Sequence, residues 1–119
     1  MVGEEYLKEW CKEYSIDFYN LISEYRDLGK STLGLTTFKR EYGISNRIAI
    51  ISINTRLEKH PFLTTPVLWH EFCHAEVWIK EGKSDGHSDK FTSRMLRKKL
   101  LWFLDVLVVP LCWIKIRYE

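Results

Sequence analysis

Cysteine and proline are scarce in this sequence, with three of each among 119 residues. The cysteines are odd in number, and none belongs to a Cys-x-x-Cys pair; they are Cys11, Cys73 and Cys112. This pattern argues against a disulfide framework and a zinc ribbon, and it favours a reducing compartment. We therefore expect an intracellular protein, in the cytoplasm or the nucleus.

The chain also lacks an apolar run long enough for a signal peptide or a membrane-spanning helix. Its N-terminus, MVGEEYLKEW, is acidic rather than apolar. The most apolar stretch, residues 100–114, is short and is interrupted by Asp105 and Pro110. We expect this stretch to form a buried element, and we expect no membrane association.

No internal repeat, linker or low-complexity tract is present, so the chain reads as one continuous domain over residues 1–119. Hydrophobic residues make up 45% of the sequence and aromatic residues 14%, which is enough to fill a compact core. The net charge is only +2. This composition argues against a disordered chain.

Apolar residues recur at spacings of three and four near the N-terminus, which predicts one long helix over residues 4–28 that ends at Gly29. The apolar positions are Leu7, Trp10, Cys11, Tyr14, Phe18, Leu21, Ile22, Tyr25 and Leu28. Two β-like segments follow, at residues 32–39 and 47–54, and the polar link between them predicts a hairpin.

A second helix is predicted to begin at Thr65-Pro66 and to end at Gly82, because threonine caps helices and proline suits the first helical position. A third helix should begin near Ser88 or Asp89. The alternating tail, residues 112–118, predicts a last strand. The order is that of an α+β protein with a small antiparallel sheet.

The second predicted helix contains His70-Glu71-Phe72-Cys73-His74. Histidines four residues apart lie one turn apart on the same helix face, so both imidazoles can reach one metal ion. Glu71 is rotated about 100° from His70, and from there it can act on a water at the metal without being a ligand. Cys73 should point away from the metal and pack in the interior.

A catalytic zinc site needs a third protein ligand. His87 is the leading candidate, because it follows Gly86 and lies just ahead of a predicted helix start. His60 remains as an alternative, and so do four carboxylates, those of Glu76, Glu81, Asp85 and Asp89. Asp85 and Asp89 could instead orient the imidazole of His87.

The segment HEFCHAEVW, followed by GHSDKF, resembles the SprT-like zinc metallopeptidases, the family of the Spartan DNA–protein crosslink protease. That family pairs HExxH with a downstream Gly-His-Gly-x-x-Phe-like segment, which Gly86, His87 and Phe91 match, while Ser88 replaces the second glycine. The similarity extends over about residues 5–118. It describes a minimal Spartan-type protease domain without a zinc ribbon.

The resemblance implies a zincin-like metallopeptidase fold, with Zn²⁺ on His70, His74 and His87 and with Glu71 as the catalytic base. It also implies a protein or peptide substrate, and action on DNA-associated proteins. The basic residues Arg94, Arg97, Lys98 and Lys99 are the candidate DNA contacts.

We expect an endopeptidase that binds extended substrate along the strand at residues 47–54 by β-augmentation. The alternative is a non-catalytic module, stabilised by zinc, that binds nucleic acid or protein. The sequence does not determine the oligomeric state.

Overall fold

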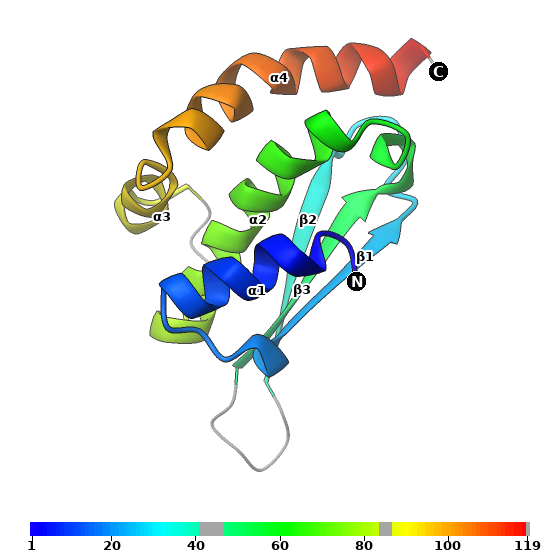
Figure 1. Ribbon diagram of the computed structural model, residues 1–119. Coiled ribbons are helices and arrows are strands. Elements are labelled where there is room, and N and C mark those ends of the chain that lie inside the picture. The colour runs from blue at the N-terminus through cyan, green and yellow to red at the C-terminus, as the bar shows by residue number, and fades with distance from the viewer. Residues whose placement is uncertain (41–46, 84–86, 119) are drawn as a thin grey trace.

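The computed structural model describes residues 1–40, 47–83 and 87–118, the last of them with the backbone alone at 108, 109 and 111–118. Its elements, in chain order, are α1 (Glu4–Glu13), η1 (Phe18–Asn20), β1 (Leu21–Arg26), β2 (Gly34–Arg40), β3 (Arg47–Asn54), η2 (Thr55–Leu57), α2 (Pro61–Glu81), α3 (Asp89–Met95) and α4 (Lys99–Tyr118) (Figure 1). The architecture is α+β, as the sequence predicts.

The described part of the chain forms a three-stranded sheet in the order β1-β3-β2. β2 pairs antiparallel with β3, which confirms the predicted hairpin, although its link at residues 41–46 lies outside the described residues. β1 pairs parallel with β3. The prediction of a purely antiparallel sheet is therefore wrong, and the sheet is mixed.

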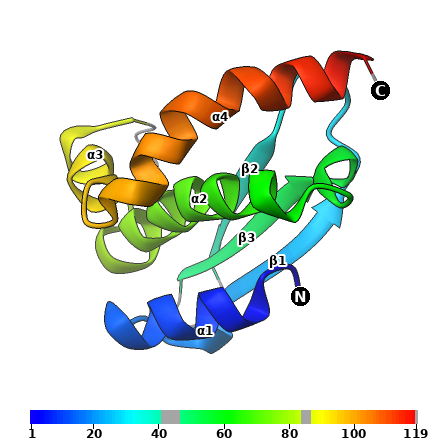
Figure 2. The ribbon, with the colours of Figure 1, turned by 45° about the horizontal axis from the view of Figure 1, so that its top comes forward.

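Helices α1 and α2 cover one face of the sheet, and α4 packs across α2 (Figures 1 and 2). The ring of Trp10 on α1 lies with its centroid 5.0 Å from Trp69 and 5.4 Å from Phe72, both on α2. These aromatic rings form the centre of one hydrophobic core, and that core holds α2 rigidly against the sheet.

The predicted long helix over residues 4–28 is wrong. Helix α1 ends at Glu13, Ser15 takes a left-handed conformation, and Asp17 caps the short helix η1. Residues 21–26 then form strand β1, where Leu21, Ser23 and Tyr25 alternate toward the core. The apolar positions in this segment fit a period of two as well as a helical period, and pairing with β3 decides between them.

Helix α2 begins at Pro61, about one turn ahead of the predicted start at Thr65-Pro66. Pro61 occupies the first helical position, where a missing N–H costs little, and Pro66 lies inside the helix. The predicted end is confirmed: Gly82 has φ 67°, and a Cβ there would lie 2.8 Å from the guanidinium carbon of Arg47.

The predicted C-terminal strand at residues 112–118 is also wrong, because α4 runs to Tyr118. A helix already formed gains one hydrogen bond for each residue added, whereas a strand needs a partner edge. The expectation that residues 100–114 form a buried element fails in part, since Leu100, Phe103, Val106 and Leu107 are exposed. No helix in the described part of the chain is both long enough and apolar enough to cross a membrane.

Candidate metal centre

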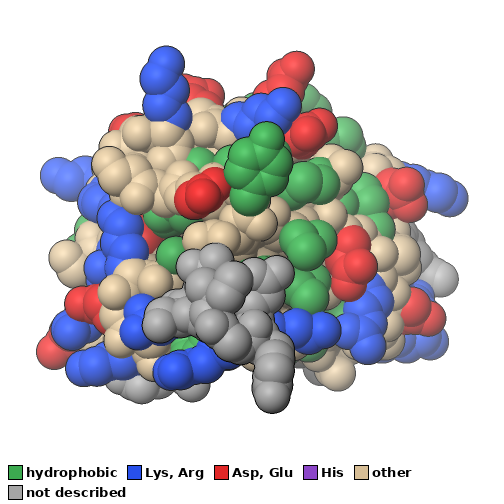
Figure 3. All heavy atoms as spheres, turned by 90° about the horizontal axis from the view of Figure 1, so that it is seen from below, with side chains coloured by type: hydrophobic (Ala, Val, Ile, Leu, Met, Phe, Trp, Pro, Cys, Tyr) green, Lys and Arg blue, Asp and Glu red, His purple; other side chains and the backbone are tan. Residues whose placement is uncertain are grey.

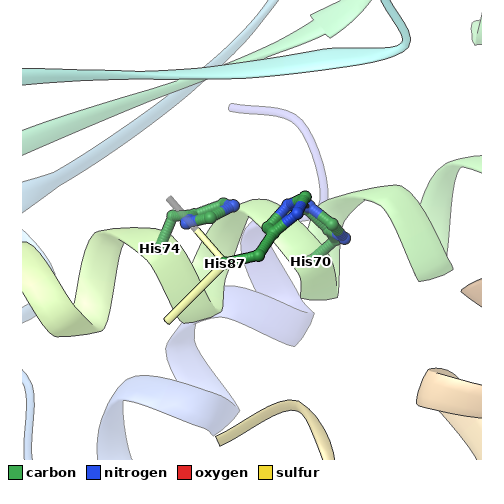
Figure 4. A group of neighbouring side chains, drawn as sticks. All are labelled: His70, His74 and His87. Atoms are coloured by element: carbon green, nitrogen blue, oxygen red, sulfur yellow. Dashed lines mark hydrogen bonds between the residues drawn. The ribbon is translucent and has the colours of Figure 1, made fainter. Parts of the chain in front are cut away.

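Three histidines from two segments of the chain converge at one point. His70 and His74 lie one turn apart on α2, and His87 reaches them from the segment ahead of α3 (Figure 4). One ring nitrogen from each of the three lies within 4.8 Å of the others. The Nε2 atoms of His70 and His87 are 3.2 Å apart. Two nitrogens bound tetrahedrally to one zinc ion lie about 3.3 Å apart, so the group can hold a metal ion.

The opposite side of the same helix turn is fixed in the core. Trp69, Phe72 and Cys73 are completely buried, and the indole Nε1 of Trp69 donates to the carbonyl oxygen of Met95, 3.3 Å away. The prediction that Cys73 packs in the interior is confirmed. Because these residues prevent α2 from rotating, His70 and His74 are presented in one fixed direction.

Helix α3 directly follows His87, and one of its side chains packs against the three histidine rings. Helix α3 begins at Asp89, which confirms the predicted start near Ser88 or Asp89, and the hydroxyl of Ser88 caps it by accepting a hydrogen bond from the Phe91 amide. The Phe91 ring stacks on His74, with centroids 4.0 Å apart, and lies 4.9 Å from the rings of both His70 and His87. Phe91 matches the family segment by sequence, but its packing role appears only in the structure.

The other candidate metal ligands either form ion pairs or lie in other parts of the chain. Glu76 pairs with Arg97, and Glu81 pairs with Lys90. Asp89 is an exposed residue in the first turn of α3, and His60 precedes the first residue of α2. Asp85 lies outside the described residues. Among the described candidates, His87 is the one that completes a group of three able to hold a metal ion.

Glu71 lies beside the histidines but faces the sheet. Its side chain is buried, and its Oε2 atom has no hydrogen-bond partner among the described residues. Burial raises the pKa of Glu71 to about 7; the nearby His70 acts to lower it and Asp105 to raise it. A buried carboxyl with an unpartnered oxygen and a pKa near neutrality can accept a proton from a water.

The imidazoles of His74 and His70 differ in their surroundings. Burial lowers the pKa of His74 to about 3, helped by His70 and His87, so this ring is neutral and able to bind a metal. Burial also acts to lower the pKa of His70, but a hydrogen bond to Asp105 and the charge of Glu71 outweigh it and raise that pKa.

Asp105 is the residue of the site that sequence reasoning missed. It belongs to α4, and its Oδ2 atom lies 3.1 Å from Nδ1 of His70. The signal in the sequence was its position as a single acid inside an apolar run, where it argues against a membrane span. Sequence reasoning proposed Asp85 and Asp89 as partners of His87, and Asp85 lies outside the described residues. The carboxylate that the described structure places on a histidine of the group is that of Asp105, on His70.

A pocket of about 240 Å³ opens beside Glu71, between the start of β2, the helix α2 and the helix α4. The lining residues are Ser31, Thr32, Leu33, Gly34, Val67, His70, Glu71 and Asp105. The strand expected to receive substrate, β3, is paired on both sides, so that expectation is wrong. The strand edge at the pocket belongs to β2.

The proposed DNA-binding cluster is largely engaged in ion pairs within the chain. Arg97 binds the buried carboxylate of Glu76, Lys98 lies 3.0 Å from Glu13, and Arg94 lies between Glu76 and Glu81. On the face seen in Figure 3, Lys and Arg side chains are spread among Asp and Glu rather than gathered into one patch. DNA binding by this cluster stays a prediction.

The fold and the site together define an α+β domain with a candidate metal-binding group of three histidines on its central helix and the segment ahead of α3. The chain belongs to the SprT-like family, whose match covers residues 4–101. The resemblance seen in the sequence is thereby confirmed. Domains of this family are metalloprotease-like and associated with zinc. No curated protein and no solved structure matches the chain.

Proposed function

We propose that this chain is a zinc-dependent endopeptidase in which Glu71 is the general base. The proposal rests on one observation: three histidine nitrogens lie within 4.8 Å of one another beside a buried carboxylate with an unpartnered oxygen. A purely structural zinc site needs its ligands alone. The position of Glu71 therefore favours catalysis over the non-catalytic binding module.

His70, His74 and His87 are the residues that would hold the zinc ion. Three protein nitrogens leave one coordination position open, as in catalytic rather than structural zinc sites. When bound, zinc supplies Lewis-acid chemistry: it lowers the pKa of water and polarises a carbonyl group. Neutral imidazoles are the form that binds a metal, and the buried His74 is kept in that form.

Glu71 would move the proton during hydrolysis. Its unpartnered Oε2 accepts a proton from the attacking water, and the same carboxyl then gives that proton to the amine that leaves. In the metal-free chain, burial raises the pKa of Glu71 to about 7, above its ordinary value. The buried surroundings also exclude competing water from the carboxyl.

The start of β2 is the proposed place for the substrate backbone. An extended peptide can pair with a strand edge through main-chain hydrogen bonds, and β2 lies at the end of the described sheet. Leu33 and Val67 give the adjoining pocket apolar walls. We therefore expect a peptide bound along β2, with an apolar side chain in the pocket.

Gly34 provides a first test of this arrangement. A Cβ at this position would lie 2.9 Å from Cγ1 of Val67 and 3.0 Å from Cγ of Glu71. Gly34→Ala should displace the Glu71 side chain and lower kcat/KM by about 10- to 100-fold. The matched control is Leu35→Ala, because Leu35 is exposed on the same strand. Equal activity in both variants would place Glu71 and β2 outside the reaction.

The metal is tested by the zinc content of the purified chain, measured by elemental analysis for the wild type, His87→Ala and His60→Ala. We expect one zinc per chain in the wild type and in His60→Ala, and loss of zinc in His87→Ala, because two imidazoles bind zinc weakly. Equal zinc in all three proteins would show that another residue completes the site. The zinc-loaded wild type should hydrolyse an unfolded protein substrate, and zinc removal by a chelator should stop the reaction.

A further inference from the structure

We propose that Asp105 is a positioning residue: its carboxylate fixes the ring of His70 for metal binding and so links the docking of α4 to the metal centre. This inference rests on the proposed function, because it assigns a role to Asp105 at the same zinc site. It goes beyond the family assignment, since the matched residues end at 101 and Asp105 follows them.

The contact between the two side chains determines which nitrogen of His70 carries the proton. A carboxylate can only accept a hydrogen bond, so Nδ1 of His70 is the nitrogen that donates to Oδ2 of Asp105, 3.1 Å away. In the neutral ring, Nε2 then has a free lone pair. That lone pair faces Nε2 of His87 at 3.2 Å, within the group that can hold a metal.

The contact is also sheltered from solvent. The side chains of Asp105 and His70 are only 14% and 24% exposed. A hydrogen bond to a charged acceptor is stronger than one between neutral groups, and partial burial strengthens it further. Asp105 therefore holds the His70 ring in one orientation and increases its basicity, which is how carboxylates act on metal-binding histidines.

Asp105 reaches the site because α4 is docked on α2. Leu101, one helical turn before Asp105, is partly buried and packs against the core. Because Asp105 contacts a candidate ligand directly, docked α4 should raise the affinity for zinc. Reciprocity then requires that bound zinc favour the docked helix by the same free energy.

The test compares the zinc affinity of the full-length wild type with that of Asp105→Ala, Asp105→Asn and Leu101→Ala, by competition with a chromogenic chelator. Asp105→Ala should raise the dissociation constant for zinc about 10- to 100-fold. Asp105→Asn should cause a smaller rise, because the amide oxygen still accepts from Nδ1–H. Leu101→Ala loses packing on the same helix face but keeps the carboxylate, so its zinc affinity should fall much less than that of Asp105→Ala.

Hydrogen exchange supplies the second readout. Zinc should increase the amide protection of α4 in the wild type and much less in Asp105→Ala. An unchanged zinc affinity in Asp105→Ala overturns this inference while leaving the proposed function intact. Equal losses of affinity in Leu101→Ala and Asp105→Ala also overturn it, because they would assign the effect to packing. Failure of the wild type to bind zinc overturns the proposed function as well.

Discussion

Replacing Glu71 with glutamine should reduce peptide hydrolysis by about 100- to 10,000-fold while leaving one zinc per chain. General-base catalysis contributes about 100- to 10,000-fold to enzymatic rates, and a glutamine amide cannot accept the proton of the attacking water. The substitution preserves the shape of a side chain that lies close to Gly34 and beside the three histidines. Zinc binding should therefore survive, and only the chemical step should be lost.

The matched control is Glu58→Gln, which makes the same chemical change at an exposed position ahead of α2. It should retain full activity and full zinc. Hydrolysis by Glu71→Gln at the wild-type rate would falsify the assigned role of Glu71. A zinc-loaded wild type without any hydrolysis would favour the non-catalytic module.

The metal-free form gives an independent check on the environment of Glu71. Its pKa in the folded chain, about 7, exceeds the ordinary value of 4.5 because the carboxyl is buried. The folded state then holds a proton that the unfolded state has lost, so this group makes stability fall as pH rises from about 4.5 to 7. Because glutamine does not titrate, the stability of metal-free Glu71→Gln should not show this decrease with rising pH.

Glu76→Gln should lower the free energy of unfolding by about 3 kcal/mol. For a domain of this size, that loss corresponds to a fall of roughly 10 °C in Tm. The Glu76 side chain is 1% exposed and binds the guanidinium of Arg97 through both oxygens. Lys80 lies 2.9 Å from the same carboxylate. Removing the negative charge leaves the partly buried cations of Arg97 and Lys80 without this carboxylate.

This loss should depend on pH in a defined direction. Burial acts to raise the pKa of Glu76, but the bonds to Arg97 and Lys80 outweigh it and lower the pKa. The stabilisation is therefore present above the ordinary pKa of 4.5 and is lost as pH falls through the lower folded value. Urea unfolding of wild type and Glu76→Gln should differ at pH 7 and converge in acid.

Glu13→Gln is the matched control for this experiment. Glu13 pairs with Lys98 at the surface, where it is 45% exposed, and such pairs contribute less than about 1 kcal/mol. A loss in Glu76→Gln no larger than that in Glu13→Gln would show that the buried network does not stabilise the fold.

The parts of the site that lie close together in sequence were predictable. His70, Glu71 and His74 lie within about one helix turn, where spacing alone determines which side chains share a face. The prediction for His87 followed from a helix end at Gly82 and a helix start near Ser88 or Asp89, two local features that the structure contains. The identity of these residues is therefore readable from about twenty residues of sequence, from helix ends and helix periodicity.

The parts that depend on distant contacts were not predictable. Residues 21–26 fit a helix by their spacing and become a strand only because β3 lies alongside. Asp105 contacts His70 although the two are 35 residues apart in the sequence. No local sequence pattern indicates which side of α4 packs against α2. The assignment of substrate to β3 failed for the same reason, since the pairing of β1 decides which strand is the edge.

The position of α2 at the centre of the molecule has a consequence for how such a protein can evolve. Twelve of its 21 residues are buried, and the turn that presents His70 and His74 also carries Trp69, Phe72 and Cys73 in the core. A substitution on this helix can therefore disturb both the folding of the domain and the metal centre, so few substitutions on it should be neutral. New specificities should arise instead by drift at Ser31 and Thr32, which line the pocket but belong neither to this helix nor to the buried core.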